Sequence, residues 1–155
     1  MDGWEGASTQ REREDGFRAG LNDTGHTLAA HGLGDFVVEN AQNVAREMFS
    51  QDSPPDAVFV ATDHMALAVI DVLRSELNLT IPDDVSVVGY DDVPPAALKA
   101  YDLTTVRQRA NVMVDETVSL IIEKIDNPAS AARHIKVASP LIVRGSAKIP
   151  KGWNT

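Results

Sequence analysis

Four segments of the chain space their apolar residues three and four positions apart, as a helix with one buried face does. They cover residues 9–24, 41–49, 63–77 and 110–126. The first opens with Thr9 and Glu12, the pattern of a capping box, in which the two side chains bind backbone N–H groups at the start of a helix. The fourth carries a stripe of valine and isoleucine. We therefore expect four helices.

Short continuous apolar runs between these helices predict strands that are covered on both faces. They lie at 56–61, 85–89 and 103–107. The first run, the helix after it and the second run span about 35 residues, the size of a βαβ unit with parallel strands. Weaker strand-like stretches occur at 26–38, which two glycines interrupt, and at 134–143. The pattern predicts an α/β fold, a parallel sheet with flanking helices.

The two ends of the chain lack such a pattern. Residues 1–8 are rich in glycine and are predicted to form an irregular or disordered start, and residues 148–155 are predicted to form a loose polar tail. Residues 9–147 are left as one lobe. A chain of 155 residues is long enough for one domain with a core, or for part of a larger unit.

The predicted helix at 63–77 has an unusual apolar run, because six consecutive apolar residues extend from Met65 to Ile70. Successive side chains point to different sides of a helix, so a single amphipathic stripe cannot bury all six. We therefore expect this helix to bury a second face against a partner.

Composition narrows the class of protein. The chain has no cysteine, which excludes disulfide scaffolds, cysteine zinc sites and thiol catalysis. Its net charge of −9 should repel phosphate backbones, so we expect no direct contact with nucleic acid. The sequence shows neither a long apolar run nor the pattern of a signal peptide, which predicts a cytoplasmic protein without a membrane partner.

Acidic and hydroxyl side chains follow two of the predicted strands, where ligands bind in parallel α/β sheets. Thr62 and Asp63 follow the first strand, and Asp91 and Asp92 follow the second. They could serve a hydroxyl-rich ligand or a divalent metal, or they could cap a helix and form a turn. We favour a cap for Asp63, a ligand contact for Asp91 and a turn for Asp92.

Motifs of catalysis are missing from the sequence. The four histidines lack zinc-site spacing, and no Walker loop, GxSxG elbow or GxGxxG turn occurs. We therefore expect no enzyme, no cofactor and no metal. One enzymatic alternative stays open, in which Asp63, Asp91 and Asp92 hold Mg²⁺.

Five ordered stretches resemble the effector-sensing domain of the lactose-repressor (LacI/GalR) family of bacterial transcription regulators. They are Arg13–Phe17, Pro55–Ala66, Ile81–Asp92, Leu103–Gln108 and Leu141–Ser146. The resemblance implies a type I periplasmic-binding-protein-like fold, in which two lobes close on a small, sugar-like effector. It begins about halfway along the family pattern, which implies that the DNA-binding headpiece and most of the first lobe are missing from this chain.

The resemblance also implies a ligand site and a dimer. The implied ligand-binding residues are Arg13, Phe36, Thr62, Asp91 and Gln108. Ala110 stands where many members carry an aromatic ring, so one wall of the site departs from the family. The implied homodimer interface comprises Met65, Val69, Ile70, Leu73 and Leu98.

The helix at 110–126 belongs to the first lobe in the family. We therefore expect it to dock on its own lobe in a changed position, to swap between chains, or to need a partner. The predicted function is effector sensing without catalysis, coupled to DNA binding in a complete regulator. A stand-alone sugar-binding protein and the Mg²⁺-dependent enzyme are the alternatives.

Overall fold

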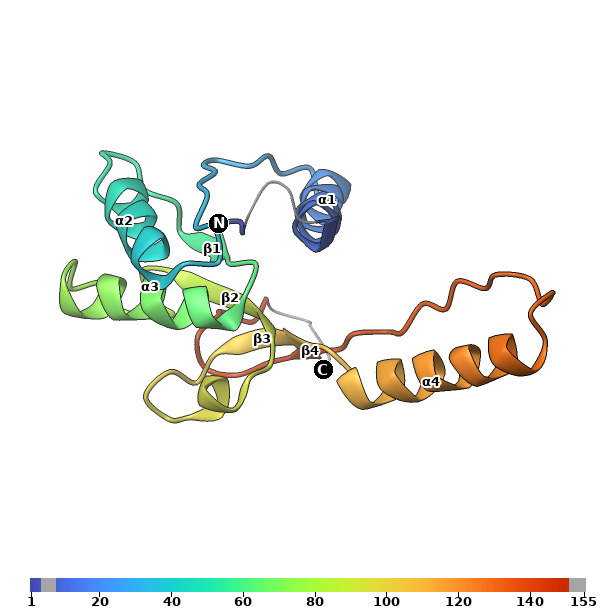
Figure 1. Cartoon of the computed structure of the whole chain (residues 1–155). Coiled ribbons are helices and arrows are strands. Elements are labelled where there is room, and N and C mark those ends of the chain that lie inside the picture. The colour runs from blue at the N-terminus through green and yellow to red at the C-terminus, as the bar shows by residue number, and fades with distance from the viewer. Residues whose placement is uncertain (4–7, 151–155) are drawn as a thin grey trace.

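The computed structural model describes residues 1–3 and 8–150, and all four predicted helices are present (Figure 1). The helices are α1 (Ser8–Asp23), α2 (Val38–Phe49), α3 (Asp63–Ser75) and α4 (Ala110–Asp126). The strands are β1 (Ala57–Phe59), β2 (Ser86–Asp91), β3 (Thr104–Arg107) and β4 (Leu141–Ile142), with a short 3₁₀ helix, η1 (Pro94–Ala97), between β2 and β3. The bounds of α4 are those predicted from the sequence.

The sheet has the order β1-β2-β3-β4, and its first three strands are parallel. β4 runs antiparallel to β3. The predicted βαβ unit is confirmed as β1, α3 and β2. The strand expected within 26–38 is wrong: Leu33 makes one isolated bridge to Asp2, and the two glycines beside it leave the segment without side chains that would pack as a strand. Of 134–143, only Leu141 and Ile142 form a strand.

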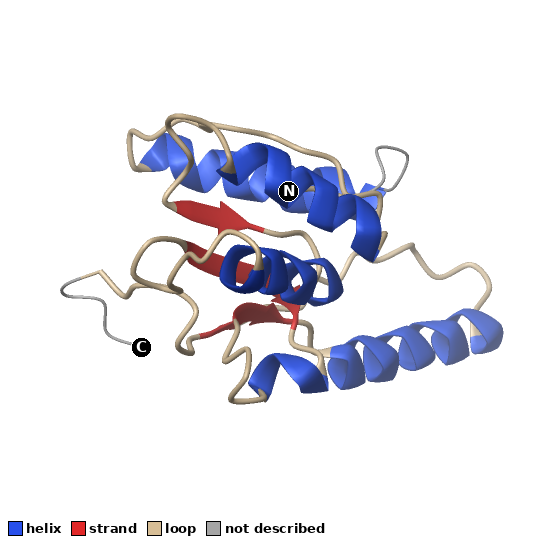
Figure 2. Ribbon diagram, turned by 90° about the vertical axis from the view of Figure 1, so that its left-hand side faces the viewer, coloured by secondary structure: helices blue, strands red, loops and turns tan. Residues whose placement is uncertain are grey.

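The hydrophobic core lies where α2 and α3 cover one face of the sheet (Figure 2). Helix α3 packs on β2 on one side and on α2 on the other. Small residues of α2, Ala41 and Ala45, are fully buried and allow the two helices to approach closely. The second buried face expected for this helix is therefore present, and α2 supplies its partner.

This packing corrects most of the expected dimer interface. Met65, Val69, Ile70 and Leu73 all have 0% exposure within the single chain. Side chains enclosed in this way by α2 and the sheet cannot reach a second copy, so their placement at an interface is wrong. Leu98 is different, because 56% of it is exposed.

The start of the chain is more regular than expected. The Met1 amine donates to the Phe59 carbonyl at 2.7 Å, and the Ala61 amide donates to the Met1 carbonyl at 3.0 Å. These bonds hold residues 1–3 against the end of β1, where they are buried. The prediction of an irregular start is therefore wrong for these three residues. Residues 4–7 and 151–155 lie outside the described residues. At the other end, Lys148 is bonded to Ser86 and to Asp83, so the predicted loose tail does not begin at 148.

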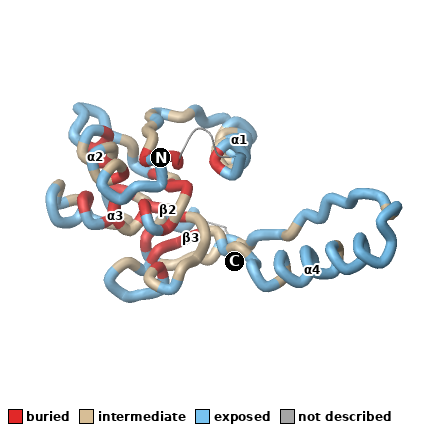
Figure 3. Tube along the Cα trace, in the orientation of Figure 1, coloured by how far each residue is buried: buried red, intermediate tan, exposed pale blue. Residues whose placement is uncertain are grey.

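Helix α4 points away from the sheet, and the chain returns beside it (Figures 1 and 3). We call residues 108–140 the excursion. None of the residues of α4 is buried, and its apolar stripe is open to solvent, with Ile121 54% and Ile125 70% exposed. The first of the three expectations, docking on its own lobe, is therefore not met.

The core and α4 offer a matched pair of substitutions. Ile70→Ala should lower the free energy of unfolding by about 2–5 kcal/mol, because it opens a cavity between α3, α2 and the sheet. Ile121→Ala should change it by no more than about 0.5 kcal/mol, because that side chain is exposed. Urea unfolding measures both. Equal losses for the two variants would contradict the arrangement of α4.

Candidate functional site

The carboxylate of Asp91, at the end of β2, joins two of the predicted ligand-binding residues. Its Oδ1 accepts a hydrogen bond from Nε2 of Gln108 at 2.5 Å and lies 3.3 Å from a guanidinium nitrogen of Arg13. The side chains of Arg13 and Asp91 are 14% and 22% exposed, so the pair is accessible without being surrounded by water. Three of the five expected ligand residues therefore form one cluster.

Arg13 is held on three sides. Besides Asp91, its guanidinium donates to the Ala61 carbonyl at 2.5 Å, and its central carbon lies 4.0 Å from the centre of the Tyr90 ring. One turn further along α1, Phe17 stacks on Phe59 of β1 with ring centres 5.0 Å apart. The stack sets α1 against the sheet and so presents the guanidinium fork at the carboxyl ends of the strands.

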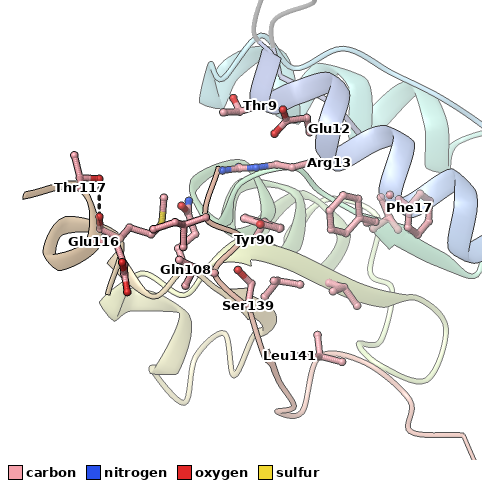
Figure 4. Close-up of a pocket in the computed structure, with 18 of the residues that line it drawn as sticks. Thr9, Glu12, Arg13, Phe17, Tyr90, Gln108, Glu116, Thr117, Ser139 and Leu141 are labelled. Carbon is pink, nitrogen blue, oxygen red and sulfur yellow. Dashed lines mark hydrogen bonds between the residues drawn. The ribbon is translucent and has the colours of Figure 1, made fainter. Parts of the chain in front are cut away.

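A cavity of about 870 Å³ opens beside this cluster (Figure 4). Arg13 reaches into it from α1, while Tyr90 and Gln108 line the sheet side. The strand residues Val88, Tyr90 and Val106 line it from the sheet, and residues of α4 and of the returning chain, such as Met113 and Val137, line it as well. The lining is mostly apolar, with a few convergent polar groups, as in sites for small organic ligands.

Of the five expected ligand residues, Arg13 and Gln108 line this cavity, whereas Asp91, Thr62 and Phe36 do not. Thr62 is the N-cap of α3, and its hydroxyl accepts from the Met65 amide at 3.5 Å. Its neighbour Ala61 contacts Arg13, so Thr62 lies next to the cluster along the chain. The Phe36 ring lies against Gly3, where a Cβ atom would come within 2.1 Å of the ring. A ligand role for either residue stays a prediction.

Asp92 does more than form a turn. Its two carboxylate oxygens accept from Nε of Arg107 at 2.5 Å and from a guanidinium nitrogen of Arg144 at 2.7 Å, and its side chain is only 6% exposed. Burial alone would raise the pKa of Asp92, but the hydrogen bonds and charges of the two arginines outweigh burial and hold the pKa below its usual value. The carboxylate is therefore ionised at neutral pH.

Asp63 is a structural tie between α3, β3 and the loop after β2. It is fully buried, accepts from the Thr105 hydroxyl at 2.6 Å and from the Val93 amide at 2.9 Å, and follows the actual cap, Thr62. Burial raises the pKa of Asp63, and these two hydrogen bonds oppose the rise. Gly89 provides the space for the Asp63 side chain, because a Cβ atom at position 89 would lie 2.2 Å from the carboxylate.

The Mg²⁺ alternative finds no support in these contacts. Asp63 is enclosed, Asp92 is taken up by two arginines, and the three carboxylates do not gather around a common point. Within residues 1–3 and 8–150, one group of three possible metal ligands lies close together, and it is a different one: Asp2, Glu14 and His31. There, His31 contacts Asp2, and Glu14 pairs with Arg18 at 2.6 Å.

Tyr90, Arg107 and Arg144 contribute to the site but were not predicted from the sequence. Tyr90 could have been found, because a residue two positions after Val88 in a strand faces the same side of the sheet. The two arginines carry no comparable signal. Their sequence positions, 107 and 144, say nothing of a shared carboxylate until the pairing of β3 with β4 is known.

The fold agrees with the comparisons. Residues 3–147 match the model of the periplasmic binding protein-like domain, and the chain belongs to that family. The relatives are LacI-type transcriptional repressors, so the resemblance inferred from the motifs is confirmed. None of the described helices has the length and apolar character needed to cross a membrane.

Two curated relatives and one solved structure illustrate the match. The HTH-type transcriptional repressor PurR of Photobacterium profundum is 29% identical over 143 residues, covering 91% of this chain and 42% of the relative. The ribose operon repressor of Escherichia coli is 30% identical over 139 residues, covering 88% and 42%. The transcriptional regulator CelR in complex with cellobiose superposes with a TM-score of 0.87 at 30% identity, over 95% of this chain and 45% of that one. The chain thus spans less than half the length of these proteins.

The tie made by Asp63 can be tested by truncation. Asp63→Ala leaves the buried Thr105 hydroxyl and the Val93 amide without their acceptor, so the free energy of unfolding should fall by about 2 kcal/mol. Asp71→Ala, at an exposed position of the same helix, should cost far less. Chemical unfolding of both variants provides the measurement, and an Asp63→Ala protein as stable as the Asp71→Ala control would refute the tie.

Proposed function

We propose that this chain is the effector-sensing part of a LacI-type transcription regulator and that it binds a sugar or sugar derivative beside Asp91. The observation that carries the proposal is the cluster of Arg13, Asp91 and Gln108, in which Arg13 and Gln108 line the cavity and both contact Asp91. A carboxylate accepts from ligand hydroxyls, a guanidinium and an amide donate to ligand oxygens, and the Tyr90 ring offers an apolar face. This combination suits a small, hydroxyl-rich molecule.

The names of the relatives point the same way. One is a ribose operon repressor, and the CelR structure holds cellobiose. In a complete regulator, the proposed site would lie between two lobes, and binding there would change the affinity for DNA carried by a separate headpiece. Such a regulator acts in the cytoplasm, where we place this chain. Catalysis has no role in the proposal.

A thermal-shift screen of pentoses, hexoses, disaccharides and sugar phosphates tests the proposal. A sugar present at ten times its dissociation constant should stabilise the chain by about 1.4 kcal/mol. We expect dissociation constants in the millimolar range, because contacts come from one lobe only. Asp91→Ala should abolish the shift, since it removes the acceptor for the ligand hydroxyls.

Asp52→Ala, an exposed substitution in the loop after α2, is the control and should leave the shift intact. Stabilisation that survives in the Asp91→Ala protein would place the ligand elsewhere. Stabilisation by Mg²⁺ with no response to any sugar would favour the enzymatic alternative over effector sensing. Tight, micromolar binding of a sugar by this chain would contradict a site built from one lobe.

We further propose that the chain forms a homodimer through the surface around Leu98. The side chain follows η1, is 56% exposed, and is the one residue of the expected interface that lies at the surface. Leu98→Asp should lower the native mass from two chains to one, because a charge would be buried without a partner. Lys99→Asp, an exposed neighbour, should have a much smaller effect. Light scattering decides, and a single-chain mass for the unaltered protein would end the proposal.

A further inference from the structure

Asp91 and Asp92 are neighbours in sequence, but their side chains contact different groups of residues. Both have left-handed backbone angles, with φ of 121° and 59°. Asp91 contacts Arg13 and Gln108, whereas Asp92 contacts Arg107 and Arg144. Consecutive positive φ values are uncommon for residues other than glycine, so the surrounding contacts hold this turn in place.

The partners of Asp92 lie on the two passages of chain that carry the excursion. Arg107 is the last residue of β3, immediately before Gln108, and its amide donates to the Pro140 carbonyl at 2.9 Å, where the excursion returns. Arg144 follows the return. Its backbone amide donates to the Thr104 hydroxyl at 2.9 Å, and its guanidinium donates to the Leu103 carbonyl at 2.7 Å. Asp92 therefore bridges the outgoing and the returning chain.

The excursion has few other attachments. Within the described residues, the hydrogen bonds of 109–139 stay inside that segment, as between Lys124 and Ser130 or Arg133 and Glu123. The orientation of the excursion is set at its base. There the backbone N–H of Gln108 donates to the Asp91 carbonyl at 3.4 Å, and the side-chain Nε2 of Gln108 donates to the Asp91 carboxylate. Whatever fixes Arg107 also fixes the residue next to it.

We propose that Asp92 is a positioning residue for the effector site: by holding Arg107 and Arg144, it keeps Gln108 on Asp91 without touching the ligand itself. The inference rests on the proposed function, because it treats Gln108 and Asp91 as ligand contacts. The carboxylate is 6% exposed and carries two charged donors, so it is fixed more firmly than an exposed ion pair. Loosening it should free Gln108 and weaken effector binding through lost preorganisation.

The first test needs no ligand. An amide side chain that donates to a carboxylate has a distinct proton NMR signal and slowed hydrogen exchange. In Arg107→Gln, which alters the half-exposed partner and leaves the buried Asp92–Arg144 pair intact, exchange at the Gln108 side chain and backbone should speed up severalfold. Asp92→Asn should give a larger change. Arg107→Lys, which restores a cation, should recover part of the effect.

Arg46→Gln is the control, because Arg46 of α2 also pairs with a carboxylate, Glu76, but in an exposed ion pair with side chains 40% and 43% exposed. It should leave the Gln108 signals unchanged. Exchange in α3 reports global stability and should stay constant in Arg107→Gln. An unchanged Gln108 signal in both Arg107→Gln and Asp92→Asn would overturn the positioning role.

A second measurement separates this inference from the proposed function. Binding of cellobiose and ribose is measured for the unaltered chain, Asp91→Asn, Asp92→Asn and Arg107→Gln. We expect the dissociation constant of the sugar that binds to rise about fivefold in Arg107→Gln and more in Asp92→Asn. Loss of binding in Asp91→Asn with unchanged affinity in the other two would overturn the positioning role alone. Unchanged binding in Asp91→Asn would count against the ligand assignment. So would the absence of binding of either sugar in a protein whose Gln108 exchange responds as expected. Both outcomes would leave the positioning of Gln108 by Asp92 standing.

Discussion

The end of β2 is the point on which the rest of the site depends. Asp91 and Asp92 sit in a left-handed turn that sends one carboxylate to Arg13 and Gln108 and the other to Arg107 and Arg144. Each carboxylate is only partly open to water, so each needs charged or amide donors to offset its lost hydration. These donors come from α1, from the end of β3 and from the chain after β4. The turn thereby joins three parts of the chain that are far apart in sequence.

The fold was largely predictable because its signals are local. Apolar spacing gave the four helices, and the run from Val58 onwards gave a buried strand followed by a capped helix. The identity of the partner for the second face of α3 was not predictable in this way. Ile70 and its neighbours are equally suited to an interface between chains or to the underside of α2, and only the tertiary arrangement places the small residues Ala41 and Ala45 against them.

The candidate site was predictable in part. Asp91 was inferred from its position after a predicted strand and again from a family resemblance, Arg13 and Gln108 came from the resemblance, and the structure brings the three together. The position of acidic residues after the strands favoured a ligand contact for Asp91 but gave no partner for it. The roles of Asp63 and Asp92 were missed for a physical reason. A carboxylate at a strand end can cap, bind or pair, and the choice depends on backbone angles and on partners such as Thr105 and Arg144, which lie 42 and 52 residues away in sequence.

Because the apolar stripe of α4 is exposed, the orientation of the helix depends on the base of the excursion. Side chains such as Ile121 and Ile125 are 54% and 70% exposed, so burial contributes little to the orientation of this helix in the isolated chain. Hydrogen bonds at the base of the excursion, made by Gln108, are then the principal constraint, and they share Asp91 with the proposed ligand site. A ligand that took the place of Gln108 on this carboxylate, as the proposed function implies, would remove one of these hydrogen bonds. Under the proposed function, ligand binding and the direction of α4 would be coupled through Asp91, the group that both use.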